Sequence, residues 1–331
     1  MKRIPLFDRA KGLGILLVVF GHLFQYGGLA FSIIFSFHMP LFFIISGMLY
    51  TVPSNTKSVS LIKSILIRYG TPFLFFSALG FIIRTLLFKK PDFSIVKLEL
   101  FYLVGSDELM TGALWFIGLL AIAMLLMPAL IDYGNKCRNN KLFLLVMLSL
   151  LSVVYSILPV TLPFRAKSIS AVVLFVYIGY LFKKEVFCIL KNPLINKYYI
   201  YTIPLCLFLI YCNKTVNIAI PVFNNFFLFV ICALHGTLGV LLLSQYKIPS
   251  IIEFLGKRSL IIFSIHGIWI AIFTRLINHF TKAAYRPMGN MPVEIIILEG
   301  FLVLFMSGIS AILLYPVYNT LYKKVSMLNK V

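Results

Sequence analysis

Residues 8–22 read DRAKGLGILLVVFGH, and residues 36–47 read SFHMPLFFIISG. Both stretches are apolar enough for a membrane interior, yet they contain an acidic residue, basic residues and two histidines. A helix advances about 1.5 Å and turns about 100° per residue, so the step from Lys11 to His22 covers about 16 Å and close to three turns. We therefore expect Lys11 and His22 on one face of one helix, with Asp8 close enough to Lys11 to pair with it.

The composition excludes a soluble globular protein. The chain has 331 residues, of which 61% are hydrophobic and 12% charged, and its mean hydropathy is +0.99. Apolar runs of about 20 residues, the length that crosses a bilayer, recur from end to end. This pattern predicts an all-α, polytopic integral membrane protein with a single transmembrane domain over 1–331 and no separate soluble domain. The first apolar run follows Lys2 and Arg3 but lacks a small-x-small cleavage site, so we expect it to be retained.

Hydropathy predicts about ten transmembrane helices, of which the sixth and seventh are short. Two thirds of the 30 lysines and arginines fall in segments that are inside if the N-terminus is inside, so the positive-inside rule places both termini in the cytoplasm. The longest outer loop, 89–112, is either a lid that recognises the acceptor or a solvated loop. The expected spans are 12–28, 33–50, 69–88, 113–131, 141–158, 168–182, 198–212, 222–243, 259–278 and 295–315.

Several function classes are disfavoured. The formal net charge of +20 comes from short loops between apolar runs, where membrane topology explains it, so no nucleic-acid partner is expected. The five cysteines have no paired spacing, which argues against disulfides and against a metal site. The chain has no phosphate-binding GxxxxGKS loop, no HExxH and no GxSxG. ATP-driven transport, zinc proteolysis and serine-hydrolase chemistry are therefore not favoured.

Four histidines fall inside predicted spans: His22, His38, His235 and His266. An ionisable group in a bilayer is costly, so each either bonds a neighbouring helix or has a function. His22 is the strongest candidate because it shares a helix face with Lys11. His38 opens the second predicted helix, with Pro40 expected in the first turn, and should face the same cavity.

Other polar residues have two interpretations each. Lys63 and Arg68, at the cytoplasmic foot of the third helix, suit either a phosphate-rich ligand or anionic lipid. Trp115 begins the fourth helix, where it is either an interfacial anchor or part of the cavity. Glu299, inside the last helix, is placed at a depth where it could neutralise Arg275.

Taken together, these segments resemble membrane acyltransferase family 3, the polytopic acyltransferases that O-acetylate bacterial surface glycans and some small molecules. That family has a basic residue, usually arginine, then ten residues and a histidine in its first helix; this chain has Lys11 and His22. Lysine supplies the charge but lacks the two-pronged guanidinium that grips a phosphate. The motifs that resemble the family are DRAKGLGILLVVFGH, FHMPLFFIISGMLY, the basic segment ending in RYGTP, ALWFIGLL, VLFVYIGYLF at 173–182, and FLGKRSLIIFSIHG.

The resemblance implies an O-acetyltransferase in the bacterial cell inner membrane. Acetyl-CoA would be the acyl donor and co-substrate, docking from the cytoplasm, and no metal is expected. The acceptor would be a hydroxyl of a lipid-linked or polymeric glycan such as O-antigen, at the outer face of the membrane. The implied residues are His22, Lys11 and Asp8 for catalysis, Lys11, Lys63 and Arg68 for acetyl-CoA, and His38, Trp115 and His266 for the acceptor.

The sequence leaves alternatives open. An imidazole near its unperturbed pKa of about 6.5 can act as a general base, or His22 can form a covalent acetyl-histidine. A proton-coupled carrier or flippase for a glycan or anionic substrate would use the buried histidines as proton relays, and a structural or sensory subunit would use them for packing. The sugar, the hydroxyl, acetyl against a larger acyl group, and a monomer against a homo-oligomer are not determined by the sequence.

Overall fold

The computed structural model describes residues 4–52, 58–88, 112–159, 162 and 165–327. Over these residues the chain is helical, and in place of strands it has an isolated bridge between Asn217 and Val222. The all-α prediction is confirmed. The loop expected to recognise the acceptor, 89–112, lies outside the described residues except for Gly112.

The helices, in chain order, account for every apolar run of the sequence. Their bounds are α1 (Pro5–Gly21), α2 (Leu29–Met48), α3 (Ser58–Ile65), the π-helix η1 (Leu66–Gly70), α4 (Thr71–Phe88), the 3₁₀ turn η3 (Gly112–Leu114), α6 (Trp115–Lys136), α7 (Arg138–Ile157), α8 (Ala166–Leu181), α9 (Lys183–Lys191), α10 (Pro193–Tyr198), the 3₁₀ turn η5 (Tyr199–Thr202), α11 (Ile203–Asn213), α12 (Phe226–Leu243), α13 (Ser250–Lys257), α14 (Ser259–Thr281) and α15 (Val293–Met327).

Eight helical segments of the described chain are long and apolar enough to cross a membrane. The other two expected spans correspond to α1, with 17 residues, and α8, with 16 residues. All ten expected spans therefore overlap helices, and the protein is a multi-pass membrane protein. That both termini are cytoplasmic stays a prediction. The eight segments are Leu29–Met48, Ser60–Ile83, Trp115–Lys136, Asn139–Ile157, Pro193–Asn213, Phe226–Leu243, Ser259–Thr281 and Val293–Ser326.

Three helix positions differ from the prediction. The first helix begins at Pro5 and ends at Gly21, about one and a half turns before the expected 12–28, because proline favours a helix start and hydropathy detects apolar side chains rather than helix ends. The second begins at Leu29, so Pro40 lies inside it rather than in its first turn. The third begins before 69: α3, η1 and α4 follow one another without a break, which places Lys63 and Arg68 in helix.

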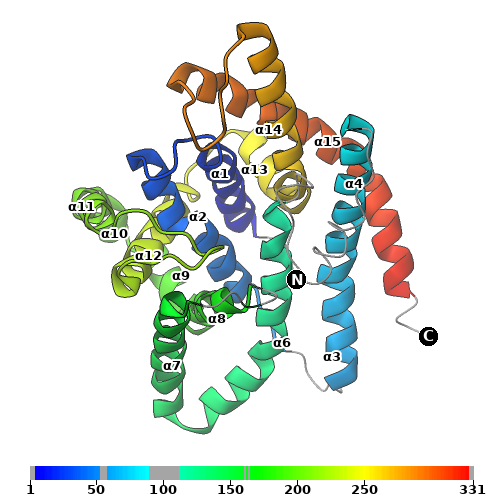
Figure 1. Cartoon of the computed structure of the whole chain (residues 1–331). Helices are drawn as coiled ribbons and strands as arrows, with labels where there is room; N and C mark the ends of the chain where they lie inside the picture. The colour runs from blue at the N-terminus through cyan, green and yellow to red at the C-terminus, as the bar shows by residue number, and fades with distance from the viewer. Residues whose placement is uncertain (1–3, 53–57, 89–111, 160–161, 163–164, 328–331) are drawn as a thin grey trace.

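The first two helices form the centre of the bundle. Helix α1 packs against α2, α12, α13, α14 and α15, and α2 packs against α8 and α12. Figure 1 shows α1 and α2, in blue, among these partners, with α4 and α15 next to each other along one flank. The central position of α1 and α2 surrounds the histidines on these helices with other helices.

Glycines allow two of these pairs to touch backbone to backbone. A Cβ atom at Gly47 of α2 would collide with the carbonyl oxygen of Val176, and one at Gly179 of α8 would collide with that of Ile44. The α1–α13 contact has the same reciprocal form, with Gly12 against Ile252 and Gly256 against Asp8. Small residues let membrane helices approach this closely, so these glycines fix how far apart the central helices lie.

A polar clamp joins the start of α1 to α13. Arg9 Nε lies 3.6 Å from Glu253 Oε2, and Lys257 Nζ lies 2.6 Å from Glu253 Oε1. The hydrogen bond from Lys257, helped by the charges of Lys257 and Arg9, lowers the pKa of the Glu253 carboxyl. Arg9 Nη1 also donates to the carbonyl oxygen of Tyr246 at 3.3 Å. Arg9 is therefore engaged at this clamp and is not a substitute for Lys11.

The substitution Gly179→Ala is expected to destabilise the protein by about 2 kcal/mol or more, because the added Cβ meets backbone that cannot rotate away. Gly70→Ala is the matched control, since nothing lies within 4 Å of a Cβ at Gly70. Thermal unfolding in detergent, followed by the monodisperse fraction after heating, measures the difference. Equal unfolding temperatures for the two variants would contradict the proposed packing constraint.

Candidate functional site

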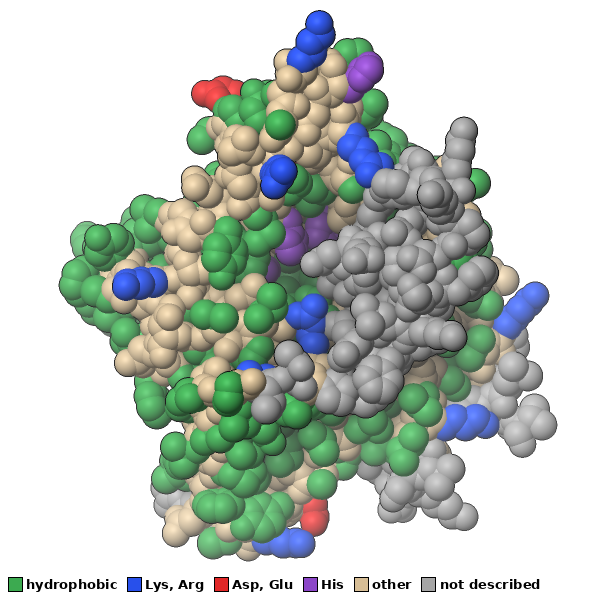
Figure 2. Space-filling model, viewed as in Figure 1, with side chains coloured by type: hydrophobic (Ala, Val, Ile, Leu, Met, Phe, Trp, Pro, Cys, Tyr) green, Lys and Arg blue, Asp and Glu red, His purple; other side chains and the backbone are tan. Residues whose placement is uncertain are grey.

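A cavity of about 480 Å³ opens on one face of the molecule. Figure 2 shows histidine side chains at the bottom of a hollow near the centre of this face, with a basic side chain close by. His22, His38 and His266, from three different helices, all line this cavity, as does Trp115. The four residues that the sequence analysis expected around one cavity are therefore brought together. The lining consists of His22, Phe35, His38, Met39, Ala113, Trp115, Arg165, Asn217, Ile218, Ala219, Ile220, Phe263, Ser264, His266, Gly267, Ile270, Ala271, Pro287 and Met288; we call it the histidine pocket.

The histidine pocket lies at one end of the bundle. It includes the residue that caps the end of α1, the first residue of α6 and the residue that precedes α8. It also includes loop residues 217–220 and 287–288. In the predicted topology all these chain segments belong to the outer side, so the pocket is expected to open outward.

His22 is the C-cap residue of α1, directly after Gly21, which packs against Ile34 and Phe35 of α2. Its ring centroid lies 5.2 Å from that of His266, with an angle of 33° between the rings. Phe35 contacts the His22 ring edge to face, with centroids 6.0 Å apart. His22 is half-buried, whereas His38 and His266 are each 2% exposed. His22 is therefore the most accessible of the three imidazoles.

Backbone carbonyls orient the two buried histidines. His38 Nδ1 lies 2.9 Å from the carbonyl oxygen of Ile34, and His266 Nδ1 lies 2.7 Å from that of Phe263. A carbonyl oxygen only accepts, so Nδ1 of each ring must donate. In the neutral ring the other nitrogen, Nε2, is then an acceptor. His38 and His266 can thus each offer an acceptor nitrogen for a hydroxyl group.

Trp115 and Arg165 form one wall of the pocket. Trp115 is 7% exposed, which favours the cavity interpretation over interfacial anchoring. The Arg165 guanidinium lies 5.8 Å from the centre of the Trp115 ring, and its Nη1 donates to the carbonyl oxygen of Ala219 at 2.7 Å. Sequence reasoning placed Arg165 only among the outer charges. Its position just before an apolar run was the one available signal, and that signal does not distinguish a cavity residue from a topology charge.

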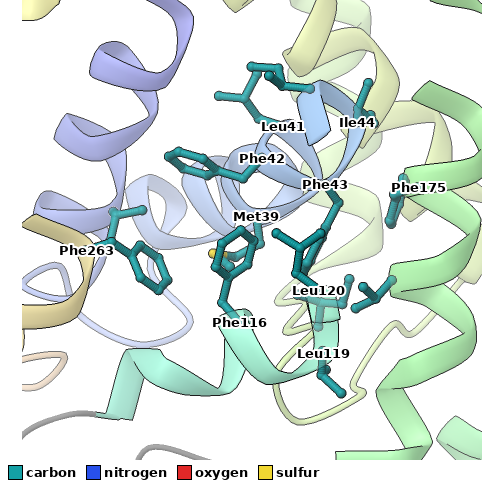
Figure 3. Close-up of a cluster of buried hydrophobic side chains, with 14 of the residues drawn as sticks. Met39, Leu41, Phe42, Phe43, Ile44, Phe116, Leu119, Leu120, Phe175 and Phe263 are labelled. Atoms are coloured by element: carbon teal, nitrogen blue, oxygen red, sulfur yellow. The ribbon is translucent and has the colours of Figure 1, made fainter. Parts of the chain in front are cut away.

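The floor of the pocket is aromatic. Phe263 and Met39 line the pocket, and the Phe116 ring lies 5.0 Å from that of Phe263 and 6.0 Å from that of Phe42. Figure 3 shows these side chains facing one another between α2, α6 and α14. Phe42 also contacts α1 at Gly14, about 12 Å of helical rise from His22 and only one turn from Lys11. The rings of Phe42, Phe116 and Phe263, which we call the phenylalanine floor, therefore lie between the levels of Lys11 and His22.

The basic residues expected to bind acetyl-CoA lie outside the histidine pocket. Lys11 is half-buried on α1, whereas Lys63 and Arg68 are exposed on α3 and η1. Helices α1 and η1 both pack against α15, so Lys11 and Arg68 are on elements that share a neighbour. Asp8 is 6% exposed on α1; its pairing with Lys11 stays a prediction.

Two further polar residues of the sequence analysis have structural partners. His235 bonds Tyr199 through Nδ1 at 3.0 Å and Thr202 through Nε2 at 2.8 Å, so it joins α12 to η5 and is not part of the pocket. Glu299 accepts a hydrogen bond from Thr274 at 2.6 Å, the residue next to Arg275. Within the described ranges, no group of three histidine, cysteine or acidic side chains is placed to hold a metal ion.

The comparisons with known proteins point to one family. A family model, Acyl_transf_3, described as an acyltransferase domain, matches residues 4–316. This range includes every residue of the histidine pocket. The search of curated proteins and the search of solved structures each found no significant match.

The hydrogen bonds of His38 and His266 predict one tautomer for both rings. In ¹⁵N solid-state NMR of histidine-labelled protein at neutral pH, both rings are expected to be protonated at Nδ1 and unprotonated at Nε2, because a backbone carbonyl fixes the proton. His38→Gln and His266→Gln assign the signals. A proton found on Nε2 alone in either ring would contradict the described orientation.

Proposed function

Because the chain belongs to the Acyl_transf_3 family of acyltransferases, we propose that this multi-pass membrane enzyme transfers an acetyl group from cytoplasmic acetyl-CoA to a sugar hydroxyl. The acceptor is a surface polysaccharide such as O-antigen, lipid-linked or polymeric, at the outer face of the bacterial inner membrane. The observation that supports this proposal best is the meeting of three histidines from separate helices in one open pocket.

His22 is the proposed general base. A hydroxyl donates its proton to the His22 imidazole while its oxygen attacks the thioester carbonyl carbon, which forms the new carbon–oxygen bond. The tetrahedral intermediate then collapses, the carbon–sulfur bond breaks, and the thiolate of CoA takes the proton from the imidazolium. The half-buried position of His22 supports this role because a base must reach both substrates. An acetyl-histidine intermediate on the same residue remains the alternative route.

His38 and His266 are proposed to position the acceptor. Each has Nδ1 engaged by its own helix backbone, so its Nε2 can accept a hydrogen bond from a sugar hydroxyl. The 5.2 Å separation of the His22 and His266 rings places such a hydroxyl near the proposed base. Trp115 supplies an apolar face of the kind that packs against the C–H surface of a sugar ring.

The acetyl donor is proposed to approach from the other side of the phenylalanine floor. Lys11, Lys63 and Arg68 are candidates for the phosphates of CoA, with Asp8 positioning Lys11. The thioester arm must then pass the level of Phe42 to reach His22, so rings of the phenylalanine floor rotate when the donor binds. Side-chain rotation of this kind breaks no hydrogen bond, because phenylalanine has none to lose.

Purified protein in lipid nanodiscs, supplied with radiolabelled acetyl-CoA and a glycan acceptor, tests the proposal. His22→Gln is expected to lower transfer at least a hundredfold, since general-base catalysis contributes about 10²-fold or more. His279→Gln is the control, because His279 is an exposed histidine on α14 outside the pocket. It is expected to retain full activity.

The assay also separates the competing functions. More than about a tenth of wild-type transfer in His22→Gln would contradict the base role. Movement of glycan across the membrane without labelling would support a carrier instead. Mass spectrometry of surface glycan from cells with and without the gene identifies the acyl group and the modified sugar together.

Lys11 is expected to act on donor affinity. Lys11→Ala should raise the KM for acetyl-CoA about tenfold with a smaller change in kcat, since a hydrogen bond to a charged group is worth about 1.5 kcal/mol or more. Lys11→Arg should preserve activity. Lys191→Ala, an exposed lysine on α9, is the control. An unchanged KM in Lys11→Ala would remove Lys11 from the donor site.

A further inference from the structure

The charge of the histidine pocket has one sign. Arg165 is the fully charged side chain of its lining, the other titratable groups are the three histidines, and no aspartate or glutamate is among the lining residues that the structure describes. Charges that line a cleft with low-dielectric walls have a large effect on what binds there. A ligand with a negative group therefore fits this pocket better than a neutral one.

Arg165 is positioned by several contacts. Its Nη1 donates to the carbonyl oxygen of Ala219 at 2.7 Å, and Ser168 Oγ donates to the same oxygen at 3.5 Å. Asn217 Oδ1 accepts from the backbone N–H of Ala219 at 2.9 Å, which shapes the loop that holds the arginine. The Trp115 ring supports the guanidinium from another side at 5.8 Å. The guanidinium is therefore oriented before any ligand binds.

The backbone at Arg165 is strained. Its φ is 46° and its ψ is 38°, the left-handed region that residues other than glycine seldom occupy. Such a conformation costs about 1 kcal/mol or more, and residues that keep it concentrate at functional sites. At this position the strained turn delivers the arginine into the pocket lining at the start of α8.

Two helices add to the positive potential. Trp115 is the first residue of α6 and Arg165 directly precedes α8, and both residues line the pocket. The N-terminus of a helix has a partial positive charge and unpaired N–H groups, both of which favour anions. The two helix ends therefore support the charge of Arg165.

We propose that Arg165 binds an oxyanion of the acceptor, so that the acceptor is an acidic glycan. This inference rests on the function proposed above and specifies its substrate class. The oxyanion is a carboxylate of an acidic sugar or a phosphate attached to the sugar, both of which pair with a guanidinium through two N–H groups. Binding it at Arg165 fixes the sugar in the pocket that contains His22.

Transfer and binding are measured separately to test this inference. The acceptors are a disaccharide containing glucuronic acid, the same disaccharide with glucose in its place, and glucose 1-phosphate. Wild-type enzyme is expected to prefer one or both acidic acceptors over the neutral one by at least tenfold in kcat/KM. Arg165→Gln should lower kcat/KM for the preferred acidic acceptor about ten- to a hundredfold and leave the neutral acceptor nearly unchanged.

The control variant is Lys167→Gln. Lys167 bonds the carbonyl oxygen of Leu158, lies outside the pocket lining, and removes the same charge two residues away. Its acceptor preference should match the wild type. Arg165→Lys should restore part of the preference, because lysine keeps the charge but not the two-pronged contact.

Binding is followed by the fluorescence of Trp115 in the Trp269→Phe background, since the chain has two tryptophans. Selective binding of an acidic acceptor that is lost in Arg165→Gln supports the inference even if no acetyl group is transferred, an outcome that would overturn the proposed function alone. Equal binding of acidic and neutral acceptors would overturn the inference. So would an equal loss of transfer to both in Arg165→Gln, since Arg165 would then act on the reaction itself.

Comparing the two acidic acceptors identifies the source of the oxyanion. Preference for the glucuronic acid disaccharide assigns a carboxylate, and preference for glucose 1-phosphate assigns a phosphate of the kind that links sugars to lipid carriers. Either preference supports an oxyanion subsite at Arg165.

Discussion

Backbone contact between helices is the constraint on which the histidine pocket depends. In water, burial of apolar surface drives helices together, but in lipid the surroundings are as apolar as the side chains, so close packing must supply the attraction. The reciprocal contacts of Gly47 with Val176 and of Gly179 with Ile44 hold α2 against α8. Those of Gly12 and Gly256 hold α1 against α13. With both central helices fixed, the side chains on them have defined neighbours.

The fixed helices explain how residues far apart in the sequence form one pocket. Helix α1 ends at Gly21, so His22 lies where the chain turns back into α2, and His38 follows two and a half turns into that helix. Helix α14 packs against α1 and presents His266 at the same level, 5.2 Å from the His22 ring. The arrangement needs no charged partner for the buried rings, because the backbone carbonyls of Ile34 and Phe263 orient them.

The sequence was sufficient to predict what depends on local pattern, and it failed where tertiary contacts decide. Apolar runs predicted the helices, and the spacing of His22 and His38 predicted a shared cavity. The ends of α1 and the internal position of Pro40 were wrong because hydropathy does not report backbone hydrogen bonding. His235 could not be separated from the other histidines, since only its contacts with Tyr199 and Thr202 show it to be a packing residue. Arg165 was missed because a cation next to an apolar run is also what membrane topology predicts.

The phenylalanine floor gives the bundle two unlike sides. Toward the pocket, the groups are imidazoles, a guanidinium and loop backbone; toward Lys11, the space between α1, α2, α6 and α14 is filled by the rings of Phe42, Phe116 and Phe263. A layer of aromatic rings contains no polar group that could hold a file of water molecules, so protons and water have no favourable place to cross it. In the proposed reaction this separation protects the thioester, because water that followed the donor to His22 would compete with the sugar hydroxyl for the same base. An enzyme that transfers acyl groups across a membrane must exclude water from exactly the step at which its two substrates meet, and a floor made of rings that can rotate without losing hydrogen bonds satisfies both requirements.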